Sequence, residues 1–272
     1  MSRERREENL RQLSARFDDY ARLNMIERAG PVPPEAAALA QSVYLAHSTS
    51  ETNFSAICES NRLLSPQRLH AERIRALRAD SVEALLGTAN AVFLYAGPFR
   101  FPATGCGVLF AAGLETNYKE GGLATPFDSG GLLHGFTRID PAETPAAFLA
   151  RHELPLPDHR RYLEASLGLL FSTPLDYLHG NDPAWPGPIG LTGGDRRRWT
   201  HEVRLPDQID LRTGYLQAVF VPISRVADPH IYGMLRWCEH SGVDYVSFNA
   251  SHGGDFETLK RECVDYITRQ IL

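Results

Sequence analysis

The sequence predicts a mixed α+β fold in which helices flank a split, mainly antiparallel sheet. Short apolar runs typical of strands are separated by longer segments with helical periodicity. Two of these runs are joined by a turn rich in glycine and proline, which favours antiparallel pairing. The sequence contains neither GxGxxG nor GxxxxGK[ST], so the main signatures of doubly wound nucleotide-binding folds are missing.

The composition is that of an ordinary globular protein. The 272 residues are 43% hydrophobic and 22% charged, enough to bury a sizeable core, and we predict a single domain over residues 1–272. A net charge of −5 gives no global attraction to nucleic acid or anionic membranes. The four cysteines lie far apart, as expected of reduced thiols, and no apolar run approaches the ~18 residues of a membrane span. We therefore predict a cytoplasmic protein with no membrane partner.

Helices are predicted wherever apolar residues recur every three to four positions. The first lies at the N-terminus, packs on the domain and ends at Gly30-Pro31. One or two more follow residue 64. The remaining predicted helices are delimited by prolines and glycines. Those with defined limits cover residues 1–30, 144–154, 158–171, 227–241 and 255–271.

The first strand is predicted over residues 42–46 and ends on His47. A polar turn, Ser48 to Ser50, follows, and Asn53 caps an amphipathic helix whose apolar face packs back on the strand. A strand, a polar side chain, a tight turn and a capped helix together present several free backbone N–H groups to a ligand. A hydrogen-bonded structural histidine is the plain alternative for His47.

Five further strands follow from apolar runs and alternating patterns. The second and third would run antiparallel to each other if the glycine- and proline-rich connection is a hairpin. The fourth ends at a Pro-Asp turn, and the fifth is apolar throughout, so we expect it to be buried on both faces. The five strands cover residues 91–95, 107–115, 199–206, 216–223 and 243–248.

Residues 118–134 form the most unusual stretch, with four glycines, an aspartate and a histidine. Glycine at this density indicates positive φ angles or a close approach of the backbone to another group. A flexible loop is the plain alternative. The run Pro-Phe-Asp-Ser-Gly-Gly is specific in residue type, and we take Asp128 and His134 as further site candidates.

Three segments carry a resemblance to a known family. The first, residues 47–64, contains His-x-Thr, then Asn-Phe-x-x-Ile and a closing Leu-Leu pair. The second, residues 91–95, is a predicted strand that ends on an aromatic residue. The third, residues 199–206, is a late predicted strand that contains a glutamate. In this order they resemble the ADP-ribosyltransferase fold. The resemblance is strongest to the branch that contains RNA 2′-phosphotransferases and the DNA-modifying bacterial toxins that pair with macrodomain antitoxins. It covers about a fifth of the chain.

The resemblance implies a split sheet around an NAD cleft and a role for each matching residue. In such enzymes a histidine and the adjoining backbone clamp NAD⁺, an aromatic residue stacks on the nicotinamide ring, and a glutamate binds the ribose 2′-hydroxyl. His47 and Glu202 are then expected on adjacent central strands, facing one cleft. The candidates are His47, Tyr95 and Glu202 as catalytic residues, and His47, Ser48, Thr49, Tyr95, Asp128 and Arg198 as NAD-binding residues.

Each of these assignments has an alternative. Tyr95 also fits a half-buried tyrosine at a strand end, and Glu202 fits an exposed strand face shared with Arg204. Arg198 closes a run of three arginines that could meet the pyrophosphate of NAD⁺ or a nucleic acid, or form a solvated loop. The sequence also departs from the family, since the second tyrosine expected after Tyr95 is replaced by Phe99 or Phe101. No histidines have a metal-binding spacing, so no metal site is predicted.

The function that the resemblance implies is an NAD-dependent ADP-ribosyltransferase, a toxin or defence effector that modifies a nucleic acid or a protein. NAD would be its substrate, and an antitoxin or immunity protein its partner. Glu202 argues against phosphate transfer, because the phosphotransferase branch uses arginines and no essential glutamate. Three alternatives remain open: a non-catalytic NAD- or nucleotide-binding domain, an NAD glycohydrolase, and an unrelated α+β hydrolase that uses Asp128 and His134.

Overall fold

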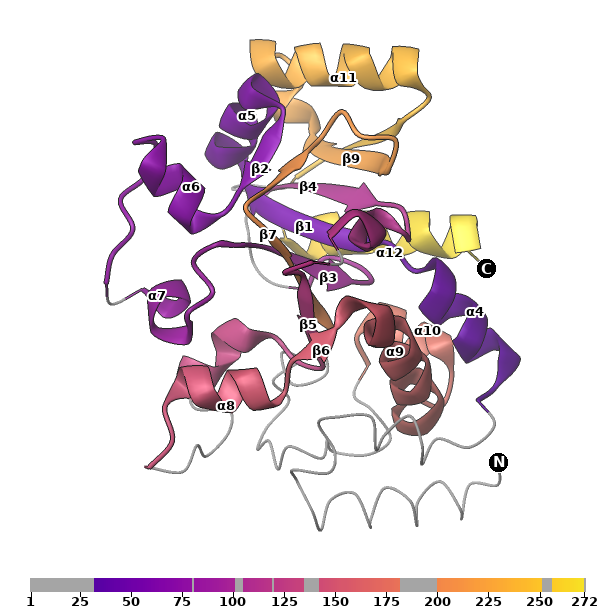
Figure 1. Ribbon diagram of the computed structural model, residues 1–272. Helices are drawn as coiled ribbons and strands as arrows, with labels where there is room; N and C mark the ends of the chain where they lie inside the picture. Colours follow the sequence, from indigo (N-terminus) through magenta and orange to yellow (C-terminus); the bar gives the residue numbers. More distant parts are fainter. Residues whose placement is uncertain are drawn as a thin grey trace.

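The computed structural model describes residues 32–79, 81–100, 105–118, 120–134, 142–181, 200–250 and 256–271. Within these residues eight strands form one sheet in the order β10-β9-β4-β1-β3-β7-β5-β6, and a small second sheet pairs β2 with β8 (Figure 1). The strands are β1 (Leu45–Ser50), β2 (Arg62–Leu64), β3 (Ala91–Ala96), β4 (Gly105–Phe110), β5 (Leu123–Thr125), β6 (Leu154–Pro155), β7 (Glu202–Pro206), β8 (Gln208–Asp210), β9 (Leu216–Pro222) and β10 (Asp244–Phe248).

The large sheet is divided into two halves between β1 and β3. Only two residue pairs join these strands, Leu45 with Ala96 and Ala46 with Tyr95. Beyond them β1 continues along β4, while the rest of β3 pairs with β7. We call the point where β1 and β3 part the fork. All pairings in the sheet are antiparallel except that of β9 with β10. The predicted mixed α+β fold with a split, mainly antiparallel sheet is confirmed.

The second and third predicted strands, β3 and β4, do not form a hairpin. β1 lies between β3 and β4 and pairs antiparallel with both, so these two strands run in the same direction without touching. β1 reaches the centre of the sheet because its first residues, Leu45 and Ala46, are small or apolar and fully buried. The two strands therefore lie on either side of β1.

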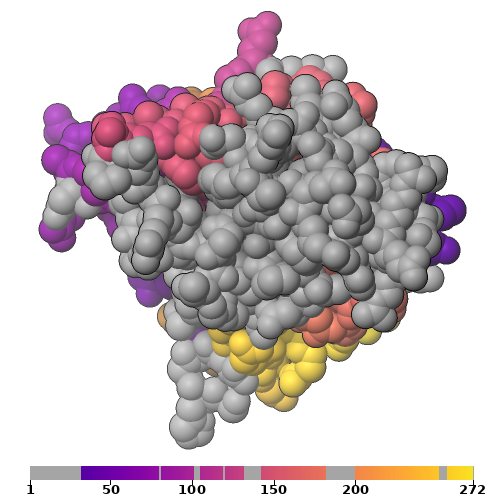
Figure 2. Space-filling model, turned by 90° about the horizontal axis from the view of Figure 1, so that it is seen from below, coloured from indigo at the N-terminus to yellow at the C-terminus, as the bar shows by residue number. Residues whose placement is uncertain are grey.

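Helices cover both faces of the sheet. α4 packs against α9 beside the half of the sheet that contains β3, β5, β6 and β7 (Figure 1). Seen from below, α8 and α12 emerge at opposite margins of the surface (Figure 2). None of these helices is both long and apolar enough to cross a membrane. They are α4 (Pro34–Ser42), α5 (Glu51–Ser60), α6 (Pro66–Ala71), α7 (Val82–Leu86), α8 (Pro145–Arg151), α9 (Leu156–Leu170), α10 (Pro174–His179), α11 (Pro229–Ser241) and α12 (Phe256–Ile271), with 3-10 turns η1 (Leu114–Tyr118), η2 (Ser129–His134) and η4 (Ile223–Arg225).

Most predicted helices after residue 140 are found within one to three residues of their expected limits. Proline and capping residues define these limits: Thr144 accepts a hydrogen bond from the Ala147 N–H at the start of α8, and Asp228 caps α11. β9 is buried on both faces, as its continuous apolar sequence predicts. The N-terminal helix predicted over residues 1–30 lies outside the described residues.

Gly107 of β4 leaves room for an aromatic ring beside the fork. A Cβ atom at this position would lie 2.3 Å from Cζ of Phe99 and 3.0 Å from the His47 carbonyl oxygen. Phe99 is fully buried and packs edge-on against Phe220, with ring centroids 5.3 Å apart, so its ring has little freedom to move. The glycine is therefore required by packing.

Gly107→Ala is expected to lower the free energy of unfolding by about 1–3 kcal/mol, the usual cost of overpacking a well-packed core. Gly233→Ala in α11 is the matched control: no atom lies within 4 Å of its added Cβ, and alanine should stabilise the helix by up to about 1 kcal/mol. Urea denaturation of both variants measures the difference. A Gly107 variant as stable as the wild type would contradict the packing described here.

Candidate functional site

β1 extends further along the chain than the sequence indicated, and it contains the candidate residues His47, Ser48 and Thr49. The strand begins at Leu45 and continues through Ser50, so the predicted polar turn over Ser48 to Ser50 is wrong. These residues pair with Gly107, Cys106 and Gly105 of β4. The helix cap is Ser50, whose side chain accepts a hydrogen bond from the Asn53 N–H, and not Asn53 itself. Ser48 and Thr49 are therefore strand residues.

His47 stands at the fork. Its Nδ1 lies 2.9 Å from the backbone oxygen of Phe93 on β3. A carbonyl can only accept, so Nδ1 carries the proton and Nε2 is left as an acceptor. Burial lowers the pKa of the ring below its ordinary value, and the hydrogen bond to Phe93 offsets part of this shift. His47 is therefore a neutral histidine whose orientation is fixed by the strand across the fork.

Tyr95 and Glu202 are neighbours across β3 and β7. They pair directly, as Ala46 does with Tyr95, so the side chains of Tyr95 and Glu202 lie on one face of the sheet. Tyr95 is half-buried. The expectation that His47 and Glu202 lie on adjacent strands is wrong, because β3 separates β1 from β7. Two strand spacings put the strands about 10 Å apart. The common cleft for His47 and Glu202 stays a prediction.

Glu202 is completely buried and only partly satisfied. Its Oε2 accepts a hydrogen bond of 3.1 Å from the Ser129 N–H, and its Oε1 lies 3.4 Å from Nε of Arg204. Alignment of this second contact is poor, and Oε1 accepts no hydrogen bond from any described residue. Burial, and then the charge of Asp128, raise the pKa of Glu202 above its ordinary value, while Arg204 and Ser129 oppose the shift. This is the strongly perturbed carboxyl expected of a functional site.

The glycine-rich stretch supplies the surroundings of Glu202. Thr125 of β5 pairs with Glu202, and the chain then turns so that Asp128 and Ser129 lie against the glutamate. Asp128 is buried, and its Oδ1 accepts a hydrogen bond of 2.8 Å from the Gly130 N–H. The stretch is thus part of the same site. Since it precedes Glu202 by more than 70 residues, no local pattern predicts that Ser129 contacts it.

Arg204 is also buried, which makes the alternative of an exposed Glu202–Arg204 strand face wrong. Its Nη2 donates a 2.8 Å hydrogen bond to Oε1 of Glu153, the residue before β6. One guanidinium thus lies between two carboxylates, Glu153 and Glu202. Alternation along β7 places Glu202 and Arg204 on the same face, as the sequence predicted, but the face is covered.

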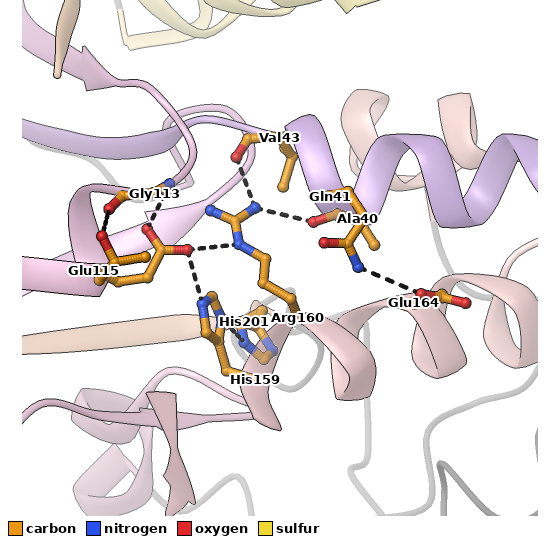
Figure 3. A network of polar contacts seen from close by, with 10 residues as sticks. Ala40, Gln41, Val43, Gly113, Glu115, His159, Arg160, Glu164 and His201 are labelled. Atoms are coloured by element: carbon orange, nitrogen blue, oxygen red, sulfur yellow. Dashed lines mark hydrogen bonds and ion pairs between the residues drawn. The ribbon is translucent and has the colours of Figure 1, made fainter. Parts of the chain in front are cut away.

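A second polar network, which sequence reasoning missed, lies beside the start of β7 (Figure 3). His201 Nε2 is 3.1 Å from His159 Nδ1, and His159 Nε2 is 3.0 Å from Oε1 of Glu115. Arg160 donates to the same oxygen at 2.7 Å and to the backbone oxygens of Ala40 and Val43. Being next to Glu202 in sequence, His201 points to the opposite face of the sheet.

Charges in this network are balanced internally. Burial alone would raise the pKa of Glu115, but the His159 hydrogen bond and the Arg160 guanidinium lower it below its ordinary value. Burial, and then the charges of His159 and Arg160, lower the pKa of His201 well below its ordinary value. Burial lowers the pKa of His159 as well. The network ties α4, η1 and α9 to the strand that carries Glu202.

Two predicted residues are not placed. Arg198 lies outside the described residues, and His134 is described only as the last residue of η2, without its side chain. In the part of the chain that the structure describes, no group of three or more histidine, cysteine, aspartate or glutamate side chains is arranged to hold a metal ion.

Comparisons with known proteins find only distant likeness. No protein-family model matches the chain, and no curated protein matches it in sequence. Among solved structures the chain is similar to DarT of Thermus sp. 2.9 in complex with NAD⁺, with a TM-score of 0.42 and 11% identity over 79% of this chain and 98% of that one. The same protein with carba-NAD⁺ gives 0.41 and 11% over 76% and 95%. At this distance the likeness says nothing about individual residues.

Proposed function

We propose that this chain is an NAD⁺-dependent ADP-ribosyltransferase that breaks the bond between nicotinamide and ribose. The observation that carries the proposal is the meeting of Tyr95 and Glu202 as cross-strand neighbours beside the fork, where His47 is held by β3. These residues are 48 to 155 positions apart in sequence, since 95 − 47 is 48 and 202 − 47 is 155. They lie on three strands that follow one another in the sheet, β1, β3 and β7, and this order supports one site with the chemistry that the sequence resemblance implies.

Glu202 supplies the carboxylate that this chemistry needs. Cleavage of NAD⁺ develops positive charge on the ribose, and a preorganised anion in a water-excluded position stabilises that charge. Oε1 of Glu202 accepts no hydrogen bond from the described residues, so it is available to a ribose hydroxyl. Its Oε2 is held by the Ser129 N–H, which fixes the orientation of the carboxylate.

His47 and Tyr95 bind the substrate. Nδ1 of His47 donates its proton to the Phe93 carbonyl, so Nε2 carries no proton and is an acceptor. In the complex, Nε2 accepts a hydrogen bond from a second hydroxyl of NAD⁺. The half-buried ring of Tyr95 offers a face for the cationic nicotinamide, an arrangement favoured by cation–π attraction. Ser48, Thr49 and Arg198 are the further residues proposed to bind NAD⁺, and Asp128 acts beside Glu202.

The acceptor of ADP-ribose is a nucleic acid or a protein, and the enzyme acts in the cytoplasm as a toxin or defence effector. Uncontrolled consumption of NAD⁺ or modification of a macromolecule harms the cell that makes the enzyme, so we propose an antitoxin or immunity protein as its partner. The DarT structures support NAD⁺ as the ligand, since both were solved with NAD⁺ or an analogue of it.

Incubation of the purified chain with NAD⁺ is expected to release free nicotinamide, measured by chromatography. The mass of the second product separates the outcomes: free ADP-ribose indicates a glycohydrolase, and a mass gain on nucleic acid or protein indicates a transferase. Binding of NAD⁺ without release of nicotinamide would point to a non-catalytic NAD-binding domain. The absence of both would contradict the proposal and leave a hydrolase based on Asp128 and His134 as the next candidate.

A further inference from the structure

We propose that Glu153 is a positioning residue of this site: it holds the guanidinium of Arg204 away from Glu202 and so keeps Oε1 of the glutamate free to accept from a hydroxyl of NAD⁺. This inference rests on the proposed function, because it concerns the carboxylate that acts in that reaction. Glu153 acts through Arg204 and needs no contact with the substrate.

The register of three strands places Glu153, Glu202 and Arg204 on one face of the sheet. Leu154 of β6 and Val203 of β7 pair with the same residue of β5, so their side chains share a face. Glu153 directly precedes Leu154, and Glu202 and Arg204 flank Val203. Because side chains alternate along an extended chain, the three charged groups project from the opposite face. Arg204 therefore lies within reach of both carboxylates.

The donors of Arg204 are divided between the two carboxylates. Nε and Nη2 lie on one edge of the guanidinium, and such an edge often pairs with both oxygens of a single carboxylate. Here Nη2 donates a 2.8 Å hydrogen bond to Oε1 of Glu153, whereas Nε lies 3.4 Å from Oε1 of Glu202. Among the described residues, neither Nε nor that Glu202 oxygen has a hydrogen-bond partner. The guanidinium is thus held by Glu153 and only lies beside Glu202.

Burial makes this division of the donors important. The side chains of Arg204 and Glu202 are 4% and 0% exposed, so little water screens the attraction between them. Without the carboxylate of Glu153, Nη2 would be a donor in a buried side chain that has lost its acceptor, which is costly. A small rotation would then bring both N–H groups of the edge onto Glu202, whose Oε1 is already 3.4 Å from Nε. Oε1 would accept from the arginine and no longer from the ribose.

Glu153→Met removes the acceptor and nearly keeps the size of the side chain, and we expect it to raise the KM for NAD⁺ by a factor of about 10–10². Pairing of Arg204 with Glu202 leaves only a fraction of the protein able to bind, and the apparent affinity falls by that fraction. Saturating NAD⁺ displaces the guanidinium, so kcat should change less than KM. Glu153→Gln, which keeps an acceptor oxygen at the same position, should have an intermediate KM. Initial rates of nicotinamide release over a range of NAD⁺ concentrations measure both constants.

Glu143→Met is the matched control. Glu143 pairs with Arg151 at 2.9 Å and is 21% exposed, against 2.8 Å and 22% for Glu153 with Arg204, so the two changes remove similar ion pairs. The control should have the KM of the wild type, because its arginine does not lie beside Glu202.

A crystal structure of Glu153→Met without ligand gives a readout that does not depend on turnover. Nε and Nη2 of Arg204 should both lie within about 3.0 Å of the Glu202 carboxylate. A guanidinium that stays in place, or a KM equal to that of the wild type, would overturn the positioning role and leave the proposed function intact. If Glu153→Met does not fold, the same two measurements on Glu153→Gln decide. A wild type that releases no nicotinamide would overturn the proposed function, and the positioning role with it.

Discussion

Replacing Glu202 by glutamine is expected to reduce nicotinamide release from NAD⁺ by a factor of about 10²–10³, the usual cost of losing one preorganised electrostatic contact to a transition state. The change keeps the size of the side chain and an oxygen that can accept from the Ser129 N–H, so the fold and NAD⁺ binding should be nearly unchanged. A loss confined to kcat identifies a contact made only in the transition state. Initial rates at saturating NAD⁺, with binding followed by calorimetry, provide the measurement.

Two further variants make this result specific. Glu239→Gln removes a carboxylate of α11 that pairs with Arg236 and is 40% exposed, and it should leave the rate unchanged. His47→Ala should weaken NAD⁺ binding, because a residue that holds the substrate acts on the ground state as well as on the transition state. A Glu202 variant that turns over NAD⁺ at the wild-type rate would remove this residue from the mechanism.

Replacing Arg160 by methionine is expected to lower the free energy of unfolding by about 3–5 kcal/mol, because it leaves a buried carboxylate without its cation. Glu115 would retain only His159 and the Gly113 N–H, and the Ala40 and Val43 carbonyls would lose the donor they share. Methionine matches the apolar stem of arginine closely enough that packing should change little. The midpoint of urea denaturation measures the effect.

Arg161→Met is the control for this change, since Arg161 is the next residue of α9 and is exposed. It should change the stability by no more than about 0.5 kcal/mol. If the Arg160→Met protein does not fold, Arg160→Lys provides the test. Lysine keeps the positive charge but lacks the several N–H donors of the guanidinium, so this variant should fold and be less stable than the wild type. An Arg160→Met protein as stable as the Arg161 variant would show that the network is not a source of stability.

The sequence identified those parts of the site that depend on local pattern. Apolar runs and alternating patterns located the central strands, and two candidates on them, Tyr95 and Glu202, are cross-strand neighbours. It misplaced β1, because Ser48 and Thr49 look like turn residues and become strand residues only beside the small residues of β4. The sequence also did not show that β1 lies between β3 and β4, because two apolar runs joined by a turn look the same whether or not a third strand separates them.

Contacts between distant segments were out of reach for the same reason. The approach of Ser129 to Glu202 and the link from Glu115 through His159 to His201 depend on how the layers stack, and no periodicity encodes them. Asp128 is an intermediate case. The density of glycines around it marked the segment as unusual, but its neighbour was visible only in three dimensions.

The order of the strands also bears on how the protein is made. Along the chain, β1, β4, β9 and β10 belong to one half of the sheet, and β3, β5, β6 and β7 to the other, so the ribosome delivers the two halves in alternation. Neither half is complete until most of the chain has been synthesised, because β7 begins at residue 202 and β10 ends at residue 248. Pairings between segments distant in sequence form slowly and leave strand edges exposed in the meantime. The nascent chain therefore carries an unfinished sheet until residue 248 has been synthesised, and a partner that covers those edges would act before the proposed site is complete.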